Sequence, residues 1–218
     1  MRVVEQARKI VELFPREHGE KDPFKVLIKT ILSQRTRDEN TDEAARRLFE
    51  AGYDTPQKLA NARPEDLYDL IKPAGMFRQK AERVIKVARE ILERFGGKVP
   101  DTLEELTSLP GVGRKTANIV LYVSFGKPAL AVDTHVHRIS NRLGWVKTKT
   151  PEETELALME ILPKELWGPI NGSMVEFGRR ICLPRNPRCK ECPLRRECEY
   201  AKINLGGPLE NHRQKTSG

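Results

Sequence analysis

Lys115 and Asp133, eighteen residues apart, are the side chains of this sequence best placed to carry out chemistry. Lys115 follows a turn in which glycines at 111 and 113 flank a valine. A proline and Gly111 end the preceding helix, because proline does not fit a helix interior and glycine adopts positive φ freely. A second helix is predicted to begin near Arg114, so the backbone N–H groups of the turn would bind a phosphate. By itself, Gly-x-Gly between helices is equally typical of a tight turn without function.

The predicted position of Lys115 in the first turn of its helix suits a nucleophile. The positive end of the helix dipole and the neighbouring Arg114 disfavour the ammonium form, and attack on carbon requires a neutral amine. The alternative is an ordinary lysine that binds phosphate. Asp133 lies between an apolar run and a helix predicted from Thr134, where it would cap the helix. A carboxylate fixed there could also stabilise positive charge on a sugar.

Helices alone are predicted to position these residues, since apolar residues recur with helical spacing and no strand pattern or internal repeat is visible. Thr102 and Glu105 form a capping box that predicts a helix of about two turns before the glycine turn. The remaining predicted helices cover residues 2–14, 22–32, 42–49, 64–71, 78–95, 134–143, 151–161 and 166–180, and a short capped turn is predicted at 55–60. The fold class is therefore all-α.

Composition indicates a globular protein with a polyanionic partner. The chain has 218 residues, of which 38% are hydrophobic, and a formal net charge of +8. An excess of Lys and Arg favours phosphate contacts and steering toward nucleic acid, although many basic proteins bind none. No apolar run has the length of a membrane span, and the N-terminus lacks the layout of a signal peptide, so we expect a cytoplasmic, nucleoid-associated protein without a membrane partner.

All four cysteines fall in one short segment: Cys182, Cys189, Cys192 and Cys198. Such clustering in a cytosolic chain indicates a metal site rather than disulfides. Both zinc and an iron–sulfur cluster accept four thiolates, but zinc sites usually pair two Cys-x-x-Cys motifs and only one occurs here. The same segment carries five cations that suit a DNA backbone contact, although they also fit a merely solvated loop: Arg185, Arg188, Lys190, Arg195 and Arg196.

Two stretches of this sequence closely resemble the helix-hairpin-helix signature of the endonuclease III family of base-excision DNA glycosylases. They are Leu-Pro-Gly-Val-Gly-Arg-Lys-Thr-Ala-Asn-Ile-Val-Leu at 109–121 and Val-Asp-Thr-His-Val-His-Arg at 132–138. In that family the lysine is the nucleophile and the aspartate its essential partner, which implies these roles for Lys115 and Asp133. The 6-2-5 spacing of the cysteines matches the family's 4Fe–4S cluster, which favours that cofactor over zinc.

Two further segments are similar to the parts of the family that enter DNA. Ser33–Asp38 resembles a Ser-Ala-Gln-Thr segment whose glutamine fills the gap left by the damaged base. This sequence departs from it, with Gln34 one position earlier and Arg35 at the family's glutamine position, so either residue is a candidate. Ala74–Ala81 is similar to Gly-Leu-Tyr-x-x-Lys-Ala, with Met76 as an apolar wedge; a core-filling methionine is the alternative.

The resemblance covers roughly residues 20–200 and implies a two-lobed protein with DNA and the flipped base in the cleft between the lobes. We expect a six-helix domain at 21–133, an iron–sulfur domain formed by 1–20 plus 134–203, and a frayed tail at 204–218. The implied activity is a DNA N-glycosylase with β-eliminating AP lyase activity. A monomer would act on double-stranded DNA that contains oxidised pyrimidines or abasic sites. The alternatives are a monofunctional glycosylase and a non-catalytic DNA-binding module.

Overall fold

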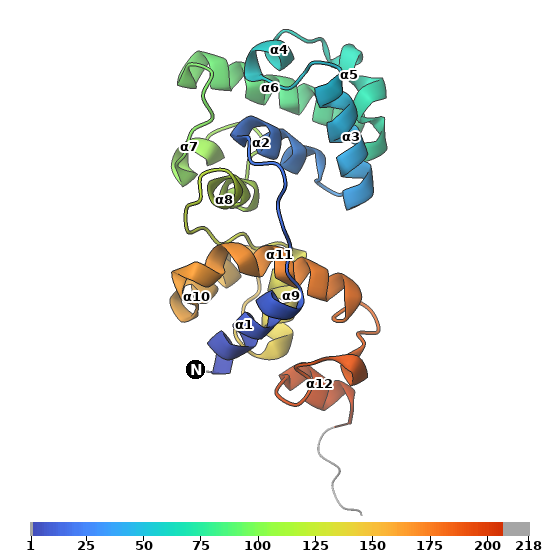
Figure 1. The fold of residues 1–218 in the computed structure, drawn as a ribbon, viewed down its shortest axis with the longest axis vertical. Coiled ribbons are helices and arrows are strands. Elements are labelled where there is room, and N and C mark those ends of the chain that lie inside the picture. The colour runs from blue at the N-terminus through green and yellow to red at the C-terminus, as the bar shows by residue number, and fades with distance from the viewer. Residues whose placement is uncertain (1, 207–218) are drawn as a thin grey trace, which may run out of the picture. The chain divides into compact units, whose positions relative to one another are not determined.

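A computed structural model describes residues 2–206 of the chain, and this part contains helices and no strand, as the sequence predicted. The chain forms two units, which Figure 1 shows with their helices labelled. The helices are α1 (Arg2–Leu13), α2 (Pro23–Leu32), α3 (Asp38–Glu50), α4 (Pro56–Ala60), α5 (Pro64–Ile71), the 3₁₀ helix η1 (Lys72–Ala74), α6 (Phe77–Phe95), α7 (Leu103–Thr107), α8 (Arg114–Val123), α9 (Thr134–Leu143), α10 (Pro151–Ile161), α11 (Lys164–Arg180), the 3₁₀ helix η2 (Cys189–Glu191) and α12 (Glu199–Asn204).

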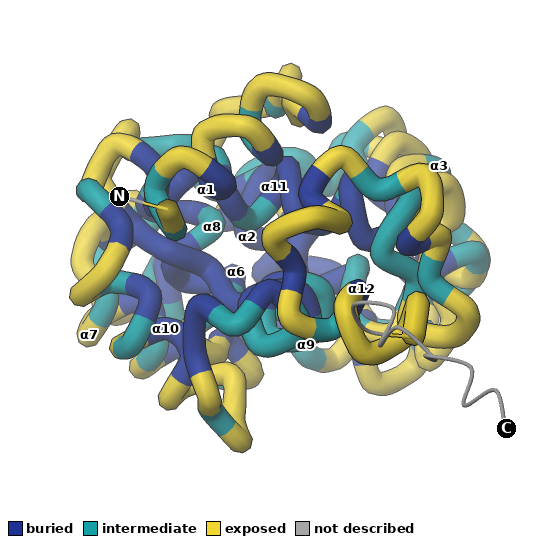
Figure 2. Tube along the Cα trace, turned by 90° about the horizontal axis from the view of Figure 1, so that it is seen from below, coloured by how far each residue is buried: buried dark blue, intermediate teal, exposed yellow. Residues whose placement is uncertain are grey.

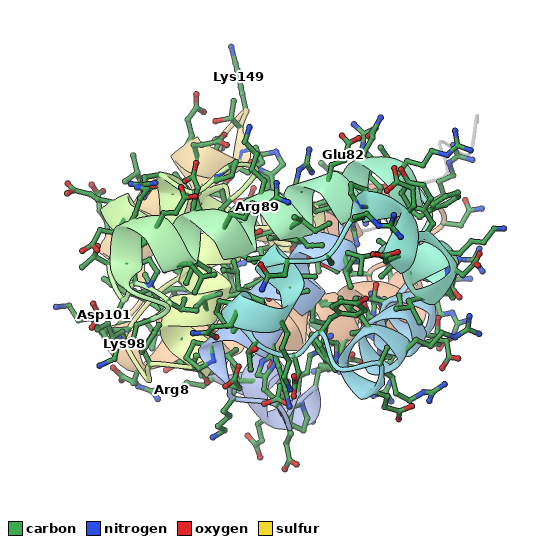
Figure 3. The ribbon with its side chains drawn as sticks, turned by 90° about the horizontal axis from the view of Figure 1, so that it is seen from above. Arg8, Glu82, Arg89, Lys98, Asp101 and Lys149 are labelled. Carbon is green, nitrogen blue, oxygen red and sulfur yellow. The ribbon has the colours of Figure 1, made fainter. Side chains whose placement is uncertain are left out.

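The first unit, His18–Ala131, carries the glycine turn and Lys115. Its helix α6 packs against α4 and α5, while α2 packs against α8 and α3. The sides of these helices that face one another are buried (Figure 2), and Leu27, Ile31 and Ile91 are among the fully buried side chains. The opposite side of α6 carries charged residues such as Glu82 and Arg89 (Figure 3). Because α6 is amphipathic, its buried face packs against α2 and against η1, the 3₁₀ helix that precedes it.

The second unit combines the described residues of Met1–Glu17 and Val132–Gly218 and carries Asp133 and the cysteines. Its helix α11 packs against α1 and α9. The rings of Phe14 and Phe177 lie 5.0 Å apart between their centroids, and the indole N–H of Trp145 donates to the side-chain oxygen of Gln6 at 2.7 Å. These contacts join the N-terminal helix to segments far along the chain. The expected domain boundaries at 20/21 and 133/134 compare with observed boundaries at 17/18 and 131/132.

Side-chain caps fix the beginnings of several helices. Asp22, Thr55, Thr102 and Thr150 each accept a hydrogen bond from the backbone N–H three residues later. These bonds satisfy donors that have no partner inside the helix, and each is typically worth about 1 kcal/mol. The local sequence therefore determines where α2, α4, α7 and α10 begin.

Several predicted boundaries differ from the observed ones. Helix α3 begins at Asp38 rather than at 42. Its N-cap residue, Arg37, is extended and makes no side-chain cap, so no capping residue marks this start in the sequence. Helix α7 spans only five residues, because the N–H of Ser108 already bonds to carbonyls of the last turn. Helix α12 extends to Asn204, one residue into the segment expected to form the tail; residues 207–218 of that segment lie outside the described residues. None of the described helices is long and apolar enough to cross a membrane.

Candidate active site

The glycine turn between α7 and α8 is closed by backbone hydrogen bonds and exposes both glycines. The N–H of Val112 donates to the carbonyl of Leu109 at 3.2 Å, and buried Val112 anchors the turn in the core. Gly113 is the N-cap of α8, so the chain passes from the glycine turn directly into the first turn of that helix. The turn therefore leads into a helix N-terminus, as the sequence predicted, and the binding of an anion there stays a prediction.

The two glycines meet different constraints. Gly111 has φ +72°, and a Cβ atom there would lie 2.5 Å from Cδ and Nε of Arg83 on α6. Gly113 has φ −91°, and a Cβ atom there would meet nothing within 4 Å. Gly111 is thus required by the backbone and by the packing of Arg83. Gly113 has no such intramolecular reason to be glycine.

Lys115 is the second residue of α8 and is partly exposed, next to the exposed Arg114. The following residues anchor the helix: Thr116, Ala117 and Asn118 are buried. The side-chain amide of Asn118 donates to the carbonyl of Leu130 at 3.1 Å, which ties α8 to the segment that leads toward Asp133. The role of Asn118 was not predicted, since a single asparagine in an apolar helix gives no signal of its distant partner.

Asp133 is the N-cap of α9, as its sequence position predicted. One carboxylate oxygen accepts a hydrogen bond from the N–H of Val136 at 2.9 Å. The other lies 3.2 Å from Nδ1 of His135, and the two side chains are only 17% and 20% exposed. A Cβ atom at Gly178 on α11 would lie 2.6 Å from the ring of His135, so this glycine makes room for the histidine. His135 is a neighbour of Asp133 that sequence reasoning did not assign to the site.

His135 and His137 do not share a site. Nδ1 of His137 lies 2.6 Å from the hydroxyl of Thr154 on α10, whereas His135 contacts Asp133. Side chains two residues apart on a helix point in different directions. The pair therefore has separate structural partners.

Gln34 and Arg35 differ sharply in their surroundings. The side-chain oxygen of Gln34 accepts a hydrogen bond from Nη1 of Arg83 at 2.8 Å, and its nitrogen lies 3.5 Å from the carbonyl of Gly111. Arg35 is exposed and has φ +54°. Met76 is 48% exposed with φ +45°, so the alternative that it fills the core is wrong. Non-glycine residues with positive φ are uncommon and cluster at functional sites.

The four cysteines are free, and α9 holds their loop. Arg142 donates to the carbonyls of Leu183 and Pro184 at 2.7 and 2.9 Å, and its Nη1 lies 3.4 Å from Sγ of Cys182. The thiol of Cys198 donates to the carbonyl of Arg142 at 3.4 Å. One arginine thus joins the first and last cysteines of the loop to the same helix.

The donor chemistry of the loop fits an iron–sulfur cluster. Besides Cys182, two sulfur atoms receive N–H donors: Cys192 from the N–H of Leu194 and Cys189 from the side chain of Asn204, both at 3.4 Å. Burial, with smaller contributions from the other three cysteines, raises the pKa of the Cys192 thiol to about 11. As they stand, residues 2–206 contain no group of three or more His, Cys, Asp or Glu side chains that could hold a metal ion.

The basic residues of the cysteine segment are all exposed, although Nη1 of Arg195 donates to the carbonyl of Lys190 at 2.6 Å. These residues are Arg185, Arg188, Lys190, Arg195 and Arg196.

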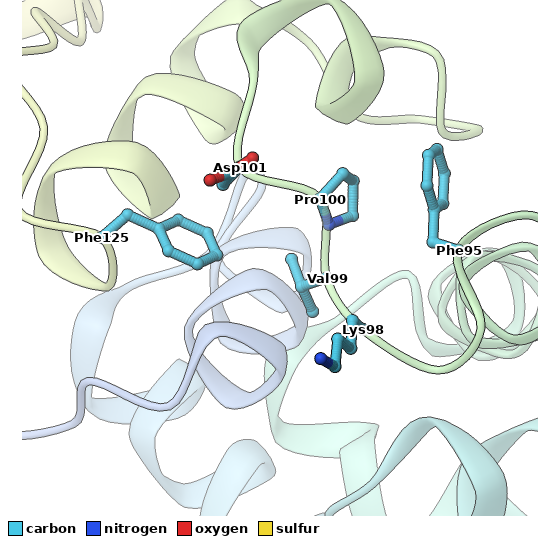
Figure 4. Close-up of a pocket in the computed structure, with 6 residues that line it drawn as sticks. All are labelled: Phe95, Lys98, Val99, Pro100, Asp101 and Phe125. Carbon is cyan, nitrogen blue, oxygen red and sulfur yellow. The ribbon is translucent and has the colours of Figure 1, made fainter.

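A separate pocket of about 380 Å³ lies where α6 ends, and Figure 4 shows Phe95, Val99 and Phe125 along its wall. Its charged residues, Lys98 and Asp101, lie at the same turn. The pocket contains none of the residues predicted for catalysis.

Comparison with known proteins gives the family. The model of the HhH-GPD superfamily of base excision DNA repair proteins matches residues 28–164. The chain is 66% identical to endonuclease III of Thermotoga maritima over 98% of this chain and all of the relative. It is 41% identical to endonuclease III of Bacillus subtilis over 87% of this chain and 88% of the relative.

A solved structure agrees with this result. It is a trapped endonuclease III–DNA covalent intermediate with an estranged adenine, and it matches with a TM-score of 0.87 and 37% identity over 94% of this chain and 97% of that one. The chain therefore belongs to the endonuclease III family, which is part of the HhH-GPD superfamily of base excision DNA repair proteins. Members of the endonuclease III family are bifunctional DNA glycosylases and AP lyases.

Proposed function

We propose that this protein excises oxidised pyrimidines from double-stranded DNA and cleaves the resulting abasic site, with Lys115 as the nucleophile. The observation that carries the proposal is the position of Lys115 one residue inside α8, directly after a turn of exposed glycines. A phosphate bound at that turn would bring the neighbouring sugar to the amine. The partner class is supported by the trapped covalent complex that a relative forms with DNA.

In the proposed reaction the lone pair of the Lys115 amine attacks C1′ of the damaged nucleotide. The glycosidic bond breaks with its electron pair going to the base, which takes up a proton and leaves. Opening of the sugar ring gives a protonated Schiff base between Lys115 and C1′. Loss of a proton from C2′ then drives elimination of the 3′ phosphate, which cleaves the strand. Every bond change is a polar step and uses no oxidant or reductant.

Asp133 would stabilise the positive charge that develops at C1′. Its hydrogen bond from the N–H of Val136 favours the ionised carboxylate and fixes its direction. A fixed charge of this kind needs no reorganisation during the reaction, and loss of one such group typically costs about 10²–10³ in rate. His135 is the contact on the other carboxylate oxygen and would hold its orientation.

The chemistry requires the nucleotide to leave the base stack, and we propose that Arg35 fills the gap. Gln34 is already committed to Arg83 and the carbonyl of Gly111, whereas Arg35 is exposed. Gln34 would then position the loop against the glycine turn. Met76 would act as the apolar wedge, since an exposed methionine on a left-handed residue has no packing role in the core.

We further propose that Cys182, Cys189, Cys192 and Cys198 hold a 4Fe–4S cluster. When bound, the cluster would supply a rigid tether for the loop and no step of the reaction. The loop would present Arg185, Arg188 and Lys190 to the DNA backbone. Replacing Arg188 and Lys190 together should reduce the slope of log K against log salt by roughly 2, because each phosphate contact contributes about 0.9. An unchanged slope would remove the loop from the DNA interface.

The lesion class is tested with a panel of duplexes that each carry one altered base. We expect base release and strand cleavage with oxidised pyrimidines, cleavage alone with an abasic site, and neither with an undamaged duplex. Lys115→Gln is the matched control, because it keeps the glycine turn and the basic loop. Excision confined to alkylated purines would overturn the proposed substrate class.

A further inference from the structure

A buried lysine lies beneath the two segments that carry Arg35 and Met76. Lys80 is the fourth residue of α6 and only 3% exposed. Its Nζ donates to the carbonyl of Leu32 at 2.8 Å, the hydroxyl of Thr36 at 2.7 Å and the carbonyl of Ala74 at 2.8 Å. A lysine has three N–H donors, so these bonds use all of them.

The three acceptors come from two segments that are about forty residues apart in sequence. Leu32 ends α2, and Thr36 lies in the loop that follows. Ala74 ends η1, just before α6. The hydroxyl of Thr36 also donates to the carbonyl of Ala74, which closes the arrangement. Lys80 therefore fixes the loop and the turn to each other as well as to α6.

Each held segment exposes one side chain on a left-handed residue. Arg35 directly precedes Thr36, and Met76 follows Ala74 by two residues. Only Arg35, Met76 and Asn186 combine positive φ with a side chain among the described residues. Arg35 and Met76 lie beside the acceptors of Lys80. They are thus two exposed residues in a strained conformation whose segments are held by the same lysine. Such conformations persist only where the surrounding structure determines them.

We infer that Lys80 is a positioning residue that holds Arg35 and Met76 as a preformed pair for insertion into damaged DNA. The inference rests on the proposed function, in which these side chains replace the flipped nucleotide. Two side chains that enter one base stack must keep a fixed spacing. A lysine satisfied by three internal acceptors provides that spacing before DNA binds, so little conformational freedom is lost on binding.

The test compares Lys80→Met with Arg89→Met. Both residues lie on α6 and donate to backbone carbonyls, but Arg89 Nε donates to Ala60 at 3.0 Å, away from the two segments. The readout is 2-aminopurine fluorescence opposite an abasic analogue in duplex DNA, which reports insertion beside the orphan base. We expect Lys80→Met to reduce the fluorescence change and to lower the ratio of duplex to single-strand abasic cleavage by about tenfold or more. Arg89→Met should match the unmodified protein.

A double-mutant cycle separates positioning from general destabilisation. Arg35→Ala and Met76→Ala should be coupled in the natural background and additive in Lys80→Met. If Lys80→Met does not fold, Thr36→Val provides the same test, because it removes one acceptor and leaves the other two. Undiminished coupling, or an equal loss in Arg89→Met, would overturn the inference. If the proposed function itself were wrong, the unmodified protein would cleave no abasic DNA, and this result distinguishes that failure from a failure of the inference about Lys80.

Discussion

Asp133 and Val136 are joined by a hydrogen bond of 2.9 Å from the backbone N–H of Val136 to the carboxylate, which makes the proposed catalytic aspartate the N-cap of α9. One side chain thus begins a helix and would stabilise charge at the sugar. Asparagine caps helices as well as aspartate does but carries no charge. The two roles can therefore be separated by substitution.

Asp133→Asn should leave the free energy of unfolding nearly unchanged and lower the single-turnover rate of base release by about 10²–10³. Asp133→Ala should lose the rate and, in addition, about 1 kcal/mol of stability with the cap. Urea unfolding and single-turnover kinetics on the same preparations measure both effects. A fully active Asp133→Asn protein would show that the negative charge is not needed.

The two glycines of the turn should respond differently to alanine. Gly111→Ala should cost roughly 1–2 kcal/mol of stability from its left-handed conformation, and it displaces Arg83 as well. Gly113→Ala should leave stability nearly unchanged and weaken binding to damaged and undamaged duplexes alike, because phosphate contacts carry no sequence information. Thermal unfolding and binding titrations test the pair. Unaltered DNA affinity in Gly113→Ala would place the phosphate elsewhere.

Iron content tests the proposed cofactor. The purified protein should be yellow-brown and contain about four iron atoms per chain with little zinc. Cys189→Ser should lose iron and fold in lower yield, because the loop loses a ligand. Metal analysis and visible absorption give the result. A colourless, active protein with one zinc ion would contradict the assignment.

Stability at alkaline pH should report on Lys80. Burial, with a smaller effect of the nearby Arg83, lowers its pKa from 10.5 to about 8. Between these values the unfolded chain binds a proton that the folded chain does not, so the contribution of Lys80 to the free energy of unfolding rises with pH across this window. Relative to Lys80→Met, the unmodified protein should gain on the order of a few kcal/mol by pH 10.5. Urea unfolding at several pH values would show no such gain if the pKa were normal.

The starts of helices were predictable where a residue next to the helix caps it, as Asp22 and Thr102 do. The start of α3 was not, because Arg37 makes no side-chain cap. The contacts that hold the segments proposed to enter DNA were also unpredictable. Lys80 contacts Thr36 across 44 residues and Arg83 contacts Gln34 across 49. Local periodicity contains no information about such partners, so the sequence left Gln34 and Arg35 as equal candidates.

The roles proposed for Lys115, Asp133 and the cysteines came from their residue types and from the resemblance to the endonuclease III family, whereas their environment came from the structure. His135 contacts Asp133 from two residues further along the same helix, whereas Gly178 and Asn118 act through contacts between separate helices or segments. Their types alone are ordinary in an all-α protein. The sequence therefore identified the groups proposed to react but not the residues that hold them.

Covalent trapping tests the central claim most directly. Borohydride added during turnover on abasic duplex DNA should reduce the Schiff base and leave the protein attached to the DNA at Lys115. Lys115→Gln should give no adduct and no strand cleavage, yet retain most of its affinity for abasic DNA. A cross-link mapped to another lysine, or robust cleavage by Lys115→Gln, would contradict the assignment of the nucleophile.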